Sequence, residues 1–145
     1  MSNPAETPAR WFLAGAILLV LTGAGHALAI ATRPAPAGER AEILARMAAL
    51  EGEMFGMTPS LLDAFRTLDL YFPILAITAG VQALLLWRKR EAASRLLRPF
   101  ASVGALGALA AAGVAFAHEL PPPALFFALV AVCFGVAAAL PAVRE

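Results

Sequence analysis

The sequence predicts an all-α integral membrane protein: a transmembrane four-helix bundle with up-down-up-down topology and an amphipathic helix in its long first loop. Two observations support this class. The 145 residues are 61% hydrophobic and 14% charged, whereas soluble domains are about 45–50% apolar and about 25% charged. The apolar residues also gather into four long stretches, which leaves room for a single integral membrane domain. The net charge of +1 gives no field that would favour nucleic acid as a partner.

The four stretches are long enough to cross a membrane, which takes about 20 apolar residues in a helix. We expect spans at about residues 11–32, 70–87, 99–117 and 122–143, and none of these ranges contains Asp, Glu, Lys or Arg. The connection at residues 118–121 is short, and a short connection makes neighbouring helices antiparallel. The lipid bilayer is therefore the first predicted partner.

The loop at residues 33–69 has structure of its own. Apolar side chains recur at helical spacing between residues 38 and 55, with charged residues between them, which predicts an amphipathic helix on the membrane surface or over the bundle. We expect Gly56 to end this helix. Thr58 is a candidate N-cap with Pro59 at the first helical position, so a helical lead-in to the second span should begin there.

The basic residues predict the orientation. Seven of them lie on the side of the chain termini and of the loop between the second and third spans: Arg10, Arg88, Lys89, Arg90, Arg95, Arg98 and Arg144. Four lie on the opposite, predicted outer side: Arg33, Arg40, Arg46 and Arg66. Because cytoplasmic loops carry the excess of Lys and Arg, we expect both termini in the cytoplasm and the chain in a bacterial inner membrane.

Small residues in the spans predict where helices approach one another. Between membrane helices, close packing of Gly and Ala replaces the hydrophobic drive. The candidate packing positions are Gly23, Gly25, Gly104, Gly107 and Gly135. The spans carry more than one such small face, so a homo-oligomer or other membrane subunits are further candidate partners.

Few polar side chains lie within the spans. We expect four of them to make hydrogen bonds between helices: Thr22, Thr78, Gln82 and Ser102.

His26 is the first candidate for a functional side chain, because an ionisable group at membrane depth is costly. His118, Glu119, Met54 and Met57 fall on the same predicted outer side. Three interpretations remain open. His26 is a neutral structural imidazole, or it belongs to a ligand or transition-metal site in which Met favours cuprous copper, or it ligates haem together with His118. The cofactor is left unknown.

No catalytic residue is predicted, because the chain has no hydrolase, metalloprotease, phosphate-loop or dinucleotide-binding motif. The spans also contain no carboxylate pair for a proton relay. We therefore expect a non-enzymatic accessory or assembly subunit of a membrane complex. The alternative is a small-ligand, haem or metal binding protein that uses His26 with His118 and Glu119. A membrane enzyme with His26 as acid or base is the third hypothesis.

Three segments resemble a family of small uncharacterised bacterial four-helix integral membrane proteins. These are Gly23 to His26, the loop MAALEGEMFGMTPSLLDAFRTLDL at residues 47–70, and PPPALFFALVAVCFGVAAAL at residues 121–140. The resemblance implies the four-helix layout. It implies no activity, because the family has none established. Members often carry Gly-Phe and a polar or His residue where this chain has residues 65–70.

Overall fold

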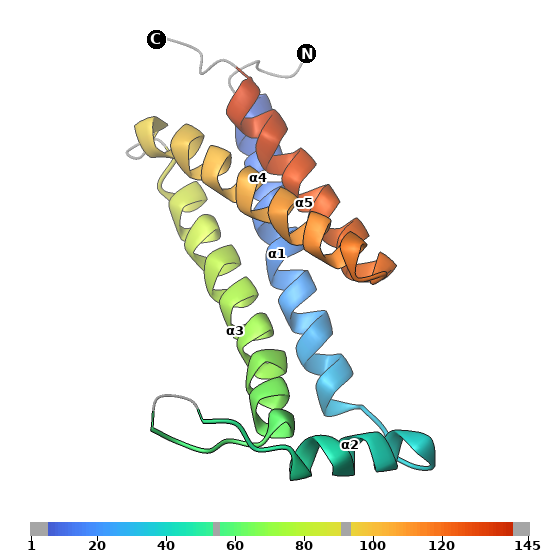
Figure 1. Ribbon diagram of the computed structural model, residues 1–145. Helices are drawn as coiled ribbons and strands as arrows, with labels where there is room; N and C mark the ends of the chain where they lie inside the picture. The colour runs from blue at the N-terminus through green and yellow to red at the C-terminus, as the bar shows by residue number, and fades with distance from the viewer. Residues whose placement is uncertain (1–5, 54–55, 91–93, 141–145) are drawn as a thin grey trace. The chain divides into compact units, whose positions relative to one another are not determined.

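The computed structural model describes residues 6–53, 56–90 and 94–140, and all the regular elements there are helices (Figure 1). The five helices are α1 (Glu6–Ala31), α2 (Glu39–Ala49), α3 (Leu61–Arg88), α4 (Ser94–Ala117) and α5 (Pro121–Ala139). The predicted all-α class is confirmed, with the short α2 lying between the long α1 and α3.

Four helices are long and apolar enough to cross a membrane. These are Thr7–Ala31, Leu61–Arg88, Arg95–Ala117 and Pro121–Ala139. A helix rises about 1.5 Å per residue, so each can span a hydrocarbon core about 30 Å thick, with flanking residues completing the shortest one. The chain is a multi-pass integral membrane protein.

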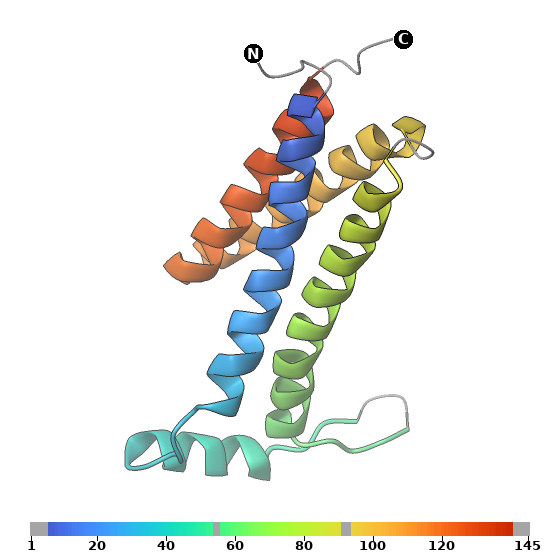
Figure 2. The same cartoon turned by 180° about the vertical axis from the view of Figure 1, so that it is seen from behind.

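The chain divides into two compact units. We call residues 1–22 with 76–145 the core unit, and residues 23–75 the loop unit. The core unit contains the first half of α1, the last part of α3, and all of α4 and α5. Its α4 and α5 form an antiparallel hairpin (Figure 1 and Figure 2), and the turn between them holds Glu119 with a positive φ of 55°.

Phe134 on α5 is the centre of the core unit. Its side chain is 0% exposed, and the ring of Phe12 lies 5.4 Å away in an edge-to-face contact. A Cβ added at Gly15 of α1 would lie 3.1 Å from the Phe134 ring, and one added at Gly104 of α4 would lie 3.0 Å from it. The two glycines therefore let one phenyl ring lie directly on the backbones of two neighbouring helices.

A second close approach joins α1 and α3. A Cβ added at Gly80 would lie 2.6 Å from Cγ2 of Val20, 2.9 Å from the Val20 backbone nitrogen and 3.0 Å from the Ala16 carbonyl oxygen. Two of these atoms are backbone, so a side chain at Gly80 could be accommodated only by moving the helices apart.

The surface of α4 is divided between protein and lipid. One stripe of alanines is buried: Ala101, Ala108, Ala112 and Ala115. The remaining surface is exposed and apolar, with Val103, Leu106, Leu109, Val114 and Phe116. An apolar surface of this kind is what a helix presents to lipid tails.

The loop unit differs from the expected boundaries. Helix α2 lies across the end of α1 and the start of α3 (Figure 2), and it ends at Ala49, not near residue 55. Leu50 is extended, and residues 50–52 pair with residues 59–61: the Leu61 N–H donates to the Leu50 carbonyl at 2.8 Å, and the Gly52 N–H donates to the Pro59 carbonyl at 3.2 Å. This pairing, together with the poor helix propensity of Gly52, ends α2 early.

The cap of α3 also differs from the expectation. The Ser60 hydroxyl oxygen accepts a hydrogen bond from the Asp63 N–H at 3.1 Å, and the same hydroxyl donates to the Asp63 carboxylate at 2.7 Å. Thr58 lies before the helix, two residues ahead of Ser60. The second span is one continuous helix from Leu61 that contains Pro73.

Two hydroxyl groups expected between helices bond within their own helix. Thr22 donates to the Leu18 carbonyl at 2.7 Å, and Ser102 donates to the Arg98 carbonyl at 3.1 Å. A hydroxyl that bonds the carbonyl four residues earlier needs no neighbouring helix. The helix ends differ as well: α1 begins at Glu6, α4 at Ser94, and α5 ends at Ala139. The expected end of the fourth span, 141–143, lies outside the described residues.

Candidate ligand-binding site

His26 of α1 is hydrogen-bonded to α3 within the loop unit. Its Nε2 lies 2.9 Å from Oδ1 of Asp69. The imidazole ring also packs edge-on against Phe72, with ring centroids 4.8 Å apart. Asp69 and Phe72 are three residues apart on one helix, so both side chains lie on the face that meets His26.

Asp69 binds a second partner through its other oxygen. Nη1 of Arg33 lies 3.0 Å from Oδ2 of Asp69, and the Asp69 side chain is 15% exposed. A carboxylate paired with a guanidinium is ionised and can only accept hydrogen bonds. His26 therefore donates from Nε2. The three side chains form one network, which we call the His26–Asp69–Arg33 network.

A pocket of about 580 Å³ adjoins this network. Its volume lies in the range of small-molecule sites, which is about 300–1,000 Å³. The polar lining is three arginines, Arg33, Arg40 and Arg66. The rest of the lining is apolar: Pro34, Ala35, Pro36, Ile43, Leu44, Met47, Leu62 and Phe65. The described lining contains no acidic residue.

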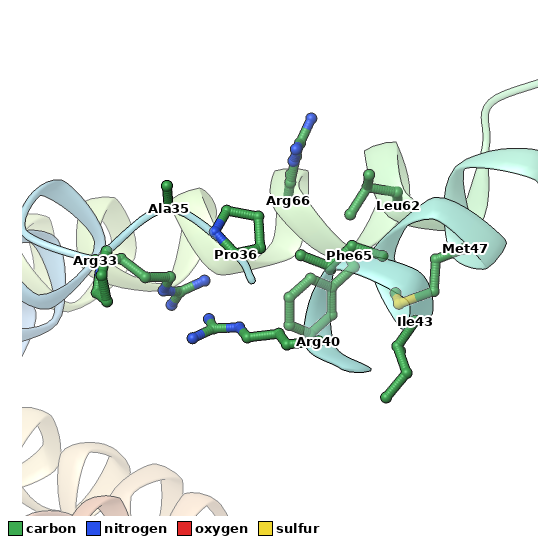
Figure 3. Close-up of a pocket in the computed structure, with 11 residues that line it drawn as sticks. Arg33, Ala35, Pro36, Arg40, Ile43, Met47, Leu62, Phe65 and Arg66 are labelled. Atoms are coloured by element: carbon green, nitrogen blue, oxygen red, sulfur yellow. The ribbon is translucent and has the colours of Figure 1, made fainter. Parts of the chain in front are cut away.

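The arginines are arranged around the pocket (Figure 3). The guanidinium groups of Arg33 and Arg40 point toward one another, whereas Arg66 extends away from them. Two like charges that face each other repel. An anion between them would remove the repulsion and accept hydrogen bonds from both groups, because a guanidinium matches carboxylate and phosphate oxygens.

The backbone around the pocket follows from its sequence. Pro34 and Pro36 have fixed φ angles and cannot continue α1. Gly38, with a φ of 57°, turns the chain into α2, and no side chain caps this helix start. Four of the pocket residues, at positions 33–36, therefore come from this connection, and Arg40 comes from the first turn of α2.

The other predicted ligands are not in the network. His118 and Glu119 lie in the turn after α4 in the core unit, whereas His26 belongs to the loop unit. Met57 is 63% exposed in the segment before α3, and Met54 lies outside the described residues. Across residues 6–53, 56–90 and 94–140, no group of three or more His, Cys, Asp or Glu side chains is placed to bind a metal ion.

The predicted packing glycines fall into two groups. Gly104 lies against Phe134, and Gly23 is buried. For Gly25, Gly107 and Gly135, a Cβ built on the backbone would meet no described atom within 4 Å.

Comparison with known proteins adds no family to this description, because no protein family model, curated protein or solved structure matches the chain. The resemblance noted in the sequence is therefore supported at the level of architecture, by the four long apolar helices.

Three residues of the site were not singled out from the sequence: Asp69, Arg33 and Arg40. Asp69 directly precedes the expected second span and so falls at the end of the predicted outer loop. A signal was present, since Asp69 shares a helical face with Phe65 and Phe72. An acid on an apolar helix face requires a partner, and the basic residue that follows the first span was available.

Proposed function

We propose that this protein is a non-enzymatic inner-membrane protein that binds an amphiphile with one anionic head and one acyl chain. The head is a carboxylate or a phosphate. The observation that carries the proposal is the pair of guanidinium groups, Arg33 and Arg40, that face each other in a pocket whose lining is otherwise mainly apolar.

The charge of the pocket supports an anionic head. Asp69 neutralises Arg33 in part through one oxygen at 3.0 Å. No ion pair within 4.0 Å is found for Arg40 or Arg66 among the described residues. The lining thus keeps an excess of positive charge, which selects for an anion over a neutral or cationic head.

The apolar part of the pocket lining is evidence for an acyl chain. Ile43, Leu44 and Met47 come from α2, and Leu62 and Phe65 come from α3. Apolar lining with a few placed charged groups is typical of sites for amphiphilic ligands. Ile43 is 50% exposed and Phe65 is 47% exposed, so these side chains have apolar surface left for a ligand to cover.

The His26–Asp69–Arg33 network gives His26 a positioning role in this proposal. His26 donates to one oxygen of Asp69, and the other oxygen holds the Arg33 guanidinium. A fixed guanidinium loses less conformational entropy when it binds an anion. His26 then acts through Asp69 and does not touch the ligand.

The test uses photo-crosslinking of the full chain in nanodiscs of zwitterionic lipid. The probe is palmitic acid with a diazirine group, and crosslinked peptides are located by mass spectrometry. We expect labelling of the pocket segments at residues 39–49 and 61–66. Arg40→Gln should weaken labelling about tenfold or more, since a hydrogen bond to a charged group contributes about 1.5–3 kcal/mol.

Arg46→Gln is the matched control, because Arg46 lies on the same helix but does not line the pocket. Competition with unlabelled palmitate and with lysophosphatidylglycerol separates the carboxylate source from the phosphate source. Labelling that is equal in wild type, Arg40→Gln and Arg46→Gln would reflect partition into lipid and would contradict the proposal.

The orientation belongs to the same proposal, with the pocket on the outer side and both termini in the cytoplasm. The excess of basic residues near the chain termini and between the second and third spans supports it. A membrane-impermeant maleimide added to intact cells should label Ala45→Cys and should not label Ala93→Cys. The opposite pattern would reverse the orientation and would leave the pocket argument unchanged.

A second candidate function, an accessory or assembly subunit, is supported by the open surface at Gly107 of α4. A Cβ built there would meet no described atom within 4 Å, so a partner helix could approach closely. Gly107→Leu should remove the protein from larger assemblies on native gels and leave its own fold intact. Gly104→Leu is unsuitable for this test, because it would collide with Phe134. Unchanged migration of Gly107→Leu would count against an assembly role.

A further inference from the structure

The core unit contains a second cavity, a groove of about 790 Å³ between α1, α3, α4 and α5. It lies where α3 ends and α4 begins, at the most basic end of the chain. The lining is mainly apolar: Leu19, Ala79, Leu85, Leu86, Leu96, Pro99, Phe100, Val103, Gly104 and Phe134. Its two polar members are Gln82 and Lys89.

Lys89 is the cation of this groove. Two of its basic neighbours are engaged elsewhere: the Arg90 guanidinium lies 4.8 Å from the ring centroid of Trp87, and Nε of Arg98 donates to the Ala138 carbonyl at 2.9 Å. No acidic residue belongs to the described lining, so the positive charge of Lys89 is open to an anion. Trp87 places this part of α3 near the membrane–water interface.

Gln82 supplies a polar group deeper in the same groove. It precedes Lys89 by seven residues, which is two helical turns, so both side chains lie on one side of α3, about 10 Å apart along the axis. No side-chain hydrogen bond within 3.5 Å is found for Gln82 among the described residues. An amide with unmet hydrogen bonds in an apolar environment costs free energy, and a ligand with a carbonyl group at this depth would remove that cost.

We propose that this groove binds an anionic phospholipid from the leaflet at the basic end of the chain. Lys89 binds the phosphate, the Gln82 amide donates to an ester carbonyl, and one acyl chain lies along Phe100 and Val103. Basic pockets between membrane helices at the cytoplasmic side are suited to such headgroups. This site is independent of the arginine-lined pocket, because it lies in the core unit and binds a membrane phospholipid.

The test is native mass spectrometry of the delipidated full chain in detergent. Phosphatidylglycerol or phosphatidylethanolamine with identical acyl chains is added in steps. We expect one phosphatidylglycerol to bind more tightly than phosphatidylethanolamine. Lys89→Gln should weaken phosphatidylglycerol binding about fivefold, the factor that corresponds to one basic residue near an anionic surface. Arg90→Gln, which removes a cation that does not line the groove, should weaken it less.

Filling the groove gives a second variant pair. Val103 is 71% exposed and lines the groove, whereas Leu106 is 69% exposed on the same helix and does not line it. Val103→Trp should abolish retention of phosphatidylglycerol, and Leu106→Trp should retain it. Equal affinity for the two lipids, or unchanged binding in either Lys89→Gln or Val103→Trp, would overturn the proposal. Both changes are at exposed positions, so a folded protein is expected in each case.

Discussion

Different kinds of interaction stabilise the inside of the core unit and the inside of the loop unit. In the core unit, Phe134 packs on Gly15 and Gly104, and α1 meets α3 at Gly80, with the contacts made by carbon atoms and backbone. In the loop unit, a hydrogen bond and an ion pair on Asp69 join the elements. Helix α2 has no buried residue at all.

The difference shows where each kind of interaction is useful in a membrane protein. In lipid, an apolar side chain gains nothing by leaving the tails, so close fit must supply the stability. Near the interface a polar network can be satisfied and can also meet a ligand. Close packing leaves a side chain few alternative conformations, whereas the arginine-lined pocket has space for a ligand.

The largest effect is expected from Phe134→Ala in the core unit. The change empties the space between Gly15 and Gly104, and removal of a buried aromatic ring costs about 3–5 kcal/mol of the free energy of unfolding. Phe126→Ala on the same helix is the control, because Phe126 is 45% exposed. Titration with SDS measures both. Equal losses would mean that Phe134 is not the centre of this unit.

Gly80→Ala comes next. The added methyl group would meet the Val20 backbone nitrogen at 2.9 Å and the Ala16 carbonyl oxygen at 3.0 Å. Backbone atoms cannot rotate away, so we expect a loss of about 1–3 kcal/mol from overpacking. Gly107→Ala serves for comparison, since a methyl group there meets open space. If thermal unfolding in detergent does not separate the two variants, close approach does not hold α1 on α3.

The fold was predictable from the sequence because hydropathy needs no tertiary information. Four uncharged stretches fix the number of spans, and all four helices were found. The internal details depend on pairing between segments. Helix α2 was expected to continue past Leu50 because Leu50 and Met54 keep the apolar period. Backbone pairing between residues 50–52 and 59–61 ends it instead, and such pairing has no local signal.

Only one residue of the candidate site, His26, could be predicted from the sequence. His26 could be singled out because an ionisable group in a span is unusual. Its partner Asp69 lies 43 positions along the chain, and no spacing rule connects two residues on different helices. The pocket was harder to predict from the sequence than His26, because residues on separate helices, such as Arg40 and Phe65, line it. The ligand role of His26, His118 and Glu119 stays a prediction.

Asp69→Asn tests the polar side of the comparison. The amide loses the charge that holds Arg33 and His26, so we expect a loss of about 1.5 kcal/mol of unfolding free energy. Arg33 is then no longer held in place for an anion, so crosslinking by the palmitate probe should fall together with stability. Asp63→Asn is the control with the same charge change on the same helix, and Ser60 is the side chain that binds it. Crosslinking that rises while stability falls would mean that Asp69 competes with the ligand for Arg33 and does not position it.

The smallest effect concerns the first turn of α3, where the sequence and the structure give different caps. Ser60→Ala removes the acceptor of the Asp63 N–H, at 3.1 Å, and loss of an N-cap costs about 0.5–1 kcal/mol at an exposed helix start. Thr58→Ala should cost less, because Thr58 lies before the helix. Hydrogen exchange of the amides at residues 61–64 measures the local opening of this turn. Faster exchange in Thr58→Ala than in Ser60→Ala would mean that Thr58 is the N-cap. Helix α3, which carries Phe65 and Asp69, would then begin earlier than Leu61.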